Sequence, residues 1–213
     1  MRLSLPLIFV LVIGLSLRAE TATISFQLHA QAGPLENAVA SLMPLDFAPP
    51  PAADDGQTKV AQENKEYEPY VTAIRADTTV RFPNHDSVQH HIYSISKAKR
   101  FEKPLYASGA SETVFFDHTG VVTLGCNIHD WMVAYIVVLP TPWFVKTGPD
   151  GTAALQGMPP GRYRLEVWHP RLAKPLSKEI TLAAGSNPGE TLDFKLKPDR
   201  RIRRAPSGTS GGY

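Results

Sequence analysis

The chain has 213 residues, of which 43% are hydrophobic and 20% are charged, and this ordinary globular composition argues against a disordered protein. Its length allows one domain or two small ones. Without the basic stretch at positions 195–204 and the first 18 residues, 14 basic residues stand against 19 acidic ones, so the body is a poor candidate for nucleic-acid binding.

The first 22 residues predict a secretory signal peptide. Arg2 provides a short basic start, residues 3–17 are almost wholly apolar, and the small residues Ala19 and Ala22 suit a cleavage site. The apolar run is short for a membrane-spanning helix, which needs about 20 residues. The sequence therefore predicts an exported, periplasmic protein with no transmembrane segment after signal removal. The alternative is a signal that stays uncleaved and anchors the protein in the membrane.

Short runs rich in Val, Ile, Thr, Tyr and Phe alternate with turns that contain most of the 19 Pro and 15 Gly residues, which is typical of an all-β sandwich. Residues 23–56 predict N-terminal strands followed by a linker. Two strands are expected around the turn at Gly33-Pro34, and residues 48–56 are rich in Pro, Ala and Asp and form the linker.

Residues 57–140 predict a second block of strands. These strands are expected at residues 79–82, 91–95, 111–116, 121–125 and 134–139. The last of them is apolar throughout, as a central strand would be. Residues 97–109 predict a longer excursion that includes one helical turn.

Residues 141–198 predict a third block, with strands at 162–168, 178–182 and 191–196. The turn Asp150-Gly151 and the run Leu-Gln-Gly-Met-Pro-Pro-Gly-Arg-Tyr163 resemble carboxypeptidase-regulatory or transthyretin-like β-sandwich modules. Residues 24–45 resemble the opening of the same module. The two flanking segments therefore form either one sandwich, with the middle block inserted, or two separate pieces. Residues 199–213 predict a disordered basic tail.

The most informative stretch is Gly-Cys-Asn-Ile-His-Asp-Trp-Met, which ends at residue 132. Cys126, His129 and Met132 recur at every third position in a short loop, so their side chains can converge on one point. A thiolate, an imidazole and a thioether are soft ligands that suit copper, whereas Met is a poor ligand for zinc. Because the chain has only this cysteine, the alternatives are an inert buried thiol and a link to another molecule.

A second imidazole is expected to complete a trigonal site of two His and one Cys with a weak axial Met. His90 offers it, where a loop after the predicted strand at 79–82 leads into the next strand.

These two segments resemble the cupredoxin family, which includes plastocyanin and amicyanin. Phe82, Asn84 and His90 match its pattern of an aromatic residue, an Asn two positions later and a His eight positions after the aromatic. The cysteine loop matches the short C-x₂-H-x₂-M form of amicyanin. The resemblance covers roughly residues 59–139. The phrases HHIYSISKAKRFEKPLY and GVVTLGCNIHDWM, with VWHPR downstream, also resemble cupredoxin-like proteins labelled "methylamine utilization protein", a label of genetic context.

The resemblance implies a cupredoxin Greek-key β-sandwich that holds one copper ion in a type 1 site. The implied ligands are His90, Cys126, His129 and Met132. Asn84 is expected to tie the two ligand loops together by hydrogen bonds. For His91 there are two alternatives: it supplies a hydrogen bond near the Cys126 sulfur, or it lies on the opposite face of its strand.

Neighbouring residues leave further alternatives open. His85 and His118 are either ordinary surface residues or part of a copper-collecting patch. Trp131 is either a core residue or a lid over the metal. Asp130 departs from the apolar surroundings that electron-transfer cupredoxins generally provide for the ligand at His129.

Three functions follow from this interpretation. The first is a one-electron Cu(I)/Cu(II) shuttle of the bacterial cell envelope, whose redox partner is a dehydrogenase or a cytochrome. The second is a periplasmic copper-binding or copper-delivery protein without a redox role. The third is a β-sandwich module with a vestigial site. An enzyme is not expected, because the paired His-x-His motifs of multicopper oxidases are absent from the sequence.

Overall fold

The computed structural model describes residues 20–52 and 56–199. Most of the predicted signal peptide and nearly all of the predicted basic tail therefore lie outside the described residues. All regular elements of the described chain are β-strands, as the sequence predicts. Within these residues, no helix is long and apolar enough to cross a membrane.

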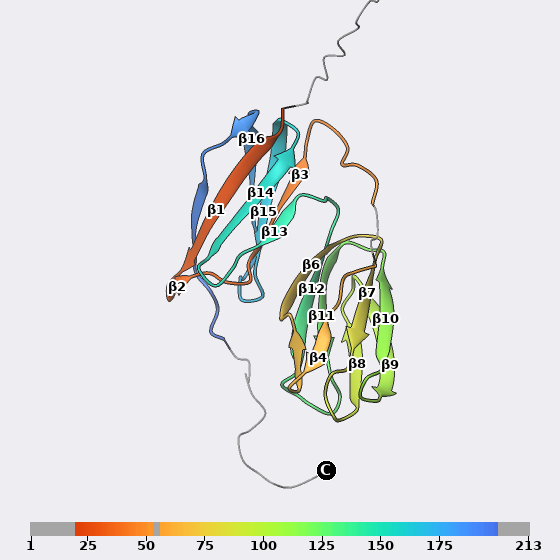
Figure 1. The fold of residues 1–213 in the computed structure, drawn as a ribbon. Helices are drawn as coiled ribbons and strands as arrows, with labels where there is room; N and C mark the ends of the chain where they lie inside the picture. The colour runs from red at the N-terminus through yellow and green to blue at the C-terminus, as the bar shows by residue number, and fades with distance from the viewer. Residues whose placement is uncertain (1–19, 53–55, 200–213) are drawn as a thin grey trace, which may run out of the picture.

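The strands form two units, which Figure 1 shows as separate bodies packed side by side. The first, called here the outer sandwich, consists of β1 (Ala22–Ala30), β2 (Gly33–Pro34), β3 (Val39–Pro44), β13 (Phe144–Lys146), β14 (Thr152–Met158), β15 (Gly161–Trp168), β16 (Leu176–Leu182), β17 (Gly185–Ser186) and β18 (Glu190–Phe194). The second, called the middle unit, consists of β4 (Ala61–Glu63), β5 (Glu66–Glu68), β6 (Val71–Arg75), β7 (Thr78–Pro83), β8 (His90–Ile95), β9 (Arg100–Tyr106), β10 (Ser111–Phe116), β11 (Gly120–Gly125) and β12 (Val133–Leu139).

The outer sandwich is built from both ends of the described chain. β1 pairs antiparallel with β14 and parallel with β18, and β3 pairs antiparallel with β13 and β15. β15 shows why these strands pack: Tyr163, Leu165 and Val167 alternate with exposed residues and are fully buried. Because side chains of a strand point alternately to its two faces, one face of β15 enters the core and the other meets solvent.

The middle unit has two sheets around one core, and β4 and β5 form a third, two-stranded sheet. The larger sheet has the order β6-β12-β11-β8-β9, and β7 pairs with β10 in the smaller one. Phe82 and Phe116 from the smaller sheet meet Ile92, Leu124 and Ile136 from the larger sheet in one buried cluster. This cluster also contains Cys126 and Met132 of the candidate site.

The expected helical turn within residues 97–109 is wrong. β9 occupies this stretch and pairs antiparallel with β8, with Ile95 opposite Arg100 and Tyr93 opposite Glu102. β9 is the last strand of its sheet, so the missing N–H of Pro104 does not interrupt a central ladder. The polar sequence and the proline of this stretch are typical of a loop, but the stretch forms an edge strand by pairing with β8.

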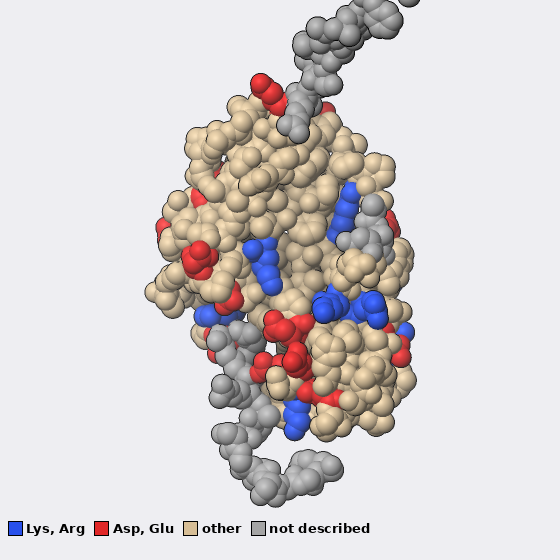
Figure 2. All heavy atoms as spheres, in the orientation of Figure 1, with Lys and Arg blue, Asp and Glu red and all other residues tan. Residues whose placement is uncertain are grey.

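A third cluster joins the two units. Val137 and Leu139 of β12 point into it, whereas Ile136 and Val138 of the same strand point into the core of the middle unit. Val39 from the outer sandwich packs in the joining cluster. β12 is therefore buried on both faces, which explains its uninterrupted apolar sequence. On the face shown in Figure 2, acidic and basic side chains lie near each other at the boundary between the units.

Candidate metal centre

Strand pairing brings the predicted ligands together. β11 and β12 form an antiparallel pair in which Gly125 lies opposite Val133, so the loop that contains Cys126, His129 and Met132 closes this hairpin. β11 also pairs with β8 at Gly125 and Tyr93, three residues after His90. The register of three neighbouring strands thus places His90 beside the cysteine loop.

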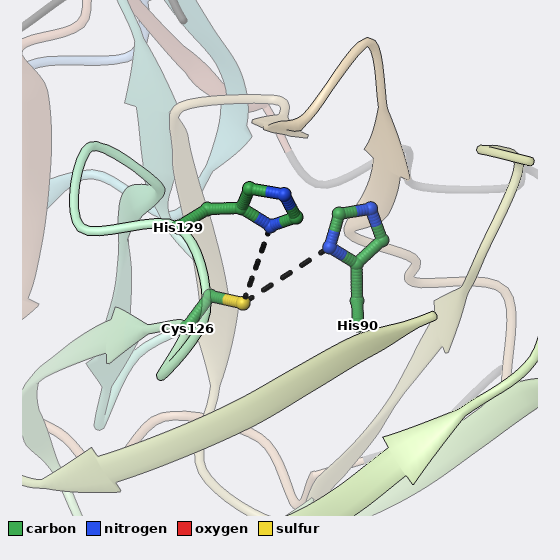
Figure 3. A group of neighbouring side chains, drawn as sticks. All are labelled: His90, Cys126 and His129. Carbon is green, nitrogen blue, oxygen red and sulfur yellow. Dashed lines mark hydrogen bonds between the residues drawn. The ribbon is translucent and has the colours of Figure 1, made fainter. Parts of the chain in front are cut away.

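Two imidazole nitrogens face the cysteine sulfur. The Sγ atom of Cys126 lies 4.0 Å from Nδ1 of His90 and 3.8 Å from Nδ1 of His129 (Figure 3). The three candidate ligand atoms all lie within 4.8 Å of one another. Metal bonds of about 2.0 Å to nitrogen and about 2.3 Å to sulfur, at trigonal angles, would place nitrogen and sulfur about 3.7 Å apart. The spacing therefore fits one metal ion between these atoms.

Met132 lies at the buried end of the cysteine loop. Its side chain is 1% exposed and belongs to the same core cluster as Cys126. The backbone N–H of Met132 donates to the carbonyl oxygen of His129 at 3.0 Å, which closes a tight turn. Met132 is therefore enclosed in the same core as Cys126, in surroundings that exclude water.

The surroundings of Cys126 favour the thiolate. Burial opposes ionisation, but hydrogen bonds outweigh it and lower the pKa of the thiol below its ordinary value. The donors are the imidazole of His90 and the backbone N–H groups of Ile128, His91 and His129. Since the thiolate is the form that binds metals, the loop prepares the sulfur for ligation.

The two imidazoles differ in their electrostatics. Burial, followed by the charges of His90 and Lys65, lowers the pKa of His129 and favours the neutral, metal-binding form. Burial also disfavours charge on His90, but hydrogen bonds to Cys126 and Asp86 outweigh this effect and raise its pKa.

Asn84 does not reach the cysteine loop, so the expectation that it ties the two ligand loops together is wrong. Its buried amide donates to the carbonyl oxygens of Val88 at 2.8 Å and Tyr106 at 3.2 Å. Its Oδ1 accepts from the backbone N–H of Asp86 at 3.0 Å. These contacts fix the conformation of the loop that leads to His90, because the Asn84 side chain bonds to backbone groups on both sides of that loop.

His91 makes the link to the cysteine loop instead. Its Nε2 lies 3.3 Å from Nδ2 of Asn127 and 2.8 Å from a carboxylate oxygen of Glu102. Its Nδ1 is buried and has no hydrogen-bond partner among the described residues. The His91 ring therefore bridges the cysteine loop and β9, while its backbone N–H hydrogen-bonds to the sulfur of Cys126.

A hairpin that the sequence analysis did not predict supports both imidazoles. β4 and β5 pair around Asn64 and Lys65, which have φ angles of 54° and 57°, as a two-residue type I′ turn requires. The backbone N–H of Lys65 donates to Asp86 at 2.9 Å, and its carbonyl oxygen accepts from the indole of Trp131 at 2.9 Å. Asp86 contacts His90, and the Trp131 ring lies 5.2 Å from that of His129.

Other histidines lie outside the group. His85 is about half exposed near Glu63, and His118 is exposed beside Asp117. His169 is buried and accepts a hydrogen bond from the backbone N–H of Arg171. Within the described residues, the only cluster of His, Cys, Asp and Glu placed to hold a metal consists of His90, Cys126 and His129.

The donor set indicates which metal fits. One thiolate and two imidazoles with an adjacent thioether match the preferences of copper, because sulfur ligands are soft and a His₂Cys set with a weak Met is typical of blue-copper sites. Calcium and magnesium prefer oxygen ligands, and none of the three clustered residues supplies one.

No protein-family model matches the chain, and no curated protein is significantly similar to it. Among solved structures, the chain is similar to a purple cupredoxin from Nitrosopumilus maritimus, with 28% identity, a TM-score of 0.36, and coverage of 39% of this chain and 100% of that one. A reduced amicyanin mutant is similar with 21% identity, a TM-score of 0.38, and coverage of 47% and 98%.

A copper-containing nitrite reductase from Thermus scotoductus SA-01 is similar with 23% identity and a TM-score of 0.39 over 46% of this chain. The match spans only 25% of that reductase. The described chain is all-β, and its His90, Cys126 and His129 are placed to bind a metal ion.

Proposed function

We propose that this protein binds one copper ion in a type 1 site and carries single electrons. The ligands in this proposal are His90, Cys126, His129 and Met132. The observation that carries it is the convergence of two imidazole Nδ1 atoms on one buried sulfur, from segments 36 residues apart in the sequence.

Copper supplies the one-electron exchange between Cu(I) and Cu(II), and the protein supplies a fixed set of donors. His90 begins β8 and Cys126 directly follows β11, and backbone pairing joins these strands, so we expect little rearrangement on a change of oxidation state. His129 is the only one of the clustered residues that is partly exposed, and its ring is the route by which an electron can reach a partner.

The proposal places the protein in the bacterial cell envelope, with a dehydrogenase or a cytochrome as its redox partner. The apolar first segment supports export. Cleavage after Ala19 leaves β1 complete, whereas cleavage after Ala22 removes the fully buried residue that pairs with Met158. N-terminal sequencing of the exported protein is expected to find a start before Ala22.

Copper loading of the purified protein tests the site. We expect intense visible absorption from thiolate-to-copper charge transfer, the copper EPR signal of a thiolate site, and a reversible one-electron couple. Cys126→Ser removes the dominant donor and is expected to abolish the colour while circular dichroism still reports the β fold. His118→Ala, which changes an exposed histidine outside the cluster, is expected to keep the colour.

Each result separates the candidate functions. Ready loss of copper to a chelator, without a reversible couple, would instead support a copper-delivery protein. If the wild-type protein takes up no copper, or if Cys126→Ser keeps the colour, the proposed site is wrong.

A further inference from the structure

The side of the His90 ring that faces away from Cys126 is held by a carboxylate. Nε2 of His90 lies 2.7 Å from Oδ2 of Asp86, a distance typical of a strong hydrogen bond to a charged acceptor. The His90 side chain is 0% exposed and that of Asp86 is 13% exposed. Solvent therefore screens this contact much less than it screens a surface pair.

Asp86 is held in place by groups that are not metal ligands. Its Oδ2 also accepts from the backbone N–H of Lys65 at 2.9 Å, and its own N–H donates to the buried amide of Asn84 at 3.0 Å. The same amide anchors the loop to Val88 and Tyr106. The carboxylate therefore keeps its position without help from a metal.

This contact determines which nitrogen of His90 is free. A carboxylate accepts a hydrogen bond from Nε2–H, so in the neutral ring Nδ1 has the lone pair, and Nδ1 is the atom that faces the sulfur (Figure 3). His129 is different: within the described residues its ring pairs with no carboxylate, and its neighbours are the rings of His90 and Trp131. One of the two imidazoles thus has an ionic partner and the other does not.

We propose that Asp86 is a positioning residue that holds His90 in the metal-binding tautomer and lowers the reduction potential of the copper site. The inference rests on the proposed function. A carboxylate that accepts a hydrogen bond from a ligand imidazole raises the basicity of that imidazole. Its negative charge also favours the more highly charged Cu(II) over Cu(I). The couple itself adds one electron to copper and neither forms nor breaks a bond within the protein.

Asp86→Asn tests the charge at nearly constant size. Equilibrium titration with a one-electron mediator is expected to show at least a tenfold decrease in the ratio of oxidised to reduced protein at a fixed ambient potential. This corresponds to a potential at least 59 mV more positive. Asp86→Glu keeps the charge and is expected to lie closer to the wild-type value.

Asp130→Asn is the matched control, because it removes one carboxylate next to His129 from an exposed position. A much smaller shift is expected there, since solvent screens exposed charges. Equal shifts for Asp86→Asn and Asp130→Asn, or no shift for Asp86→Asn, would overturn the proposal.

NMR of the metal-free protein provides a readout that needs no copper. At a pH at which His90 is neutral, long-range ¹H–¹⁵N spectra are expected to show its Nε2–H tautomer in the wild type and a mixture of tautomers in Asp86→Asn. A mixture already present in the wild type would contradict the positioning role. If the wild type binds no copper but shows the single tautomer, the proposed function fails while the role of Asp86 stands.

Discussion

At the residue scale, His90 and His129 face the same sulfur atom from very different surroundings. His90 is fully buried, and a carboxylate occupies its far side. His129 is partly exposed and is covered on one side by Trp131. Removing either ring leaves a vacant ligand position, but only the position of His129 is open to a molecule from solvent.

His129→Gly with added imidazole tests this difference. We expect copper-loaded His129→Gly to lose its visible absorption and to regain most of it when millimolar imidazole fills the gap. His90→Gly is the matched variant, and imidazole is expected to restore little of its absorption, because the vacated space is enclosed. Optical titration measures both. Equal recovery in the two variants would show that the two positions are equally accessible.

At the element scale, turns position the strands through backbone conformations that few residues adopt. Gly151 lies at the turn before β14 with a φ of 73°, and its carbonyl oxygen accepts from the N–H of Leu28 in β1. A Cβ atom there would lie 2.3 Å from the carbonyl oxygen of Leu28. Gly157 has nearly the same φ of 74°, but its Cβ would meet nothing within 4 Å.

These two glycines separate backbone strain from steric contact. Gly157→Ala is expected to lower the free energy of unfolding of the outer sandwich by about 1 kcal/mol, the cost of a left-handed conformation for a residue with a Cβ. Gly151→Ala is expected to cost about 1–3 kcal/mol more, because β1 and β14 must move apart. Urea unfolding curves measure both values. Equal losses of unfolding free energy in the two variants would mean that the backbone at Leu28 moves away from the new Cβ atom at no cost.

At the scale of the whole molecule, aromatic rings join the two units. Tyr135 of β12 packs against Trp168 of β15, with ring centroids 5.7 Å apart, and edge-on against Tyr70 at 5.5 Å. These contacts lie beside the joining cluster of Val39, Val71, Val137 and Leu139. The two units are therefore expected to stabilise each other.

A double-mutant cycle measures this coupling. For Tyr135→Ala combined with Trp168→Ala, the interaction free energy is expected to be about 0.5–1.5 kcal/mol, as for other aromatic pairs. Tyr135→Ala combined with Trp143→Ala is the control, because Trp143 packs against Phe47 and Tyr163 in the outer sandwich. The losses of unfolding free energy caused by Tyr135→Ala and Trp143→Ala are expected to be additive. A zero interaction term for the first pair would show that the units are energetically independent.

Prediction from sequence succeeded where the signal is local. The spacing of Cys126, His129 and Met132 confines three donors to one short loop, whatever the rest of the fold does. The alternation in β15 and the apolar run in β12 likewise report directly which faces are buried. β4 and β5 escaped prediction because strands of three residues are too short to show a period. β9 escaped because its polar sequence and Pro104 resemble a loop.

The sequence by itself determined the all-β class, the cysteine loop with its soft donors, and His90 as the candidate second imidazole. Only the tertiary structure decided that β1 joins β14 and β18 in one sandwich, that His91 rather than Asn84 reaches the cysteine loop, and that Asp86 holds the far side of His90. The physical reason is that periodicity and turn chemistry act between near neighbours in the chain. Strand register and side-chain hydrogen bonds depend instead on segments that meet only when the chain has folded.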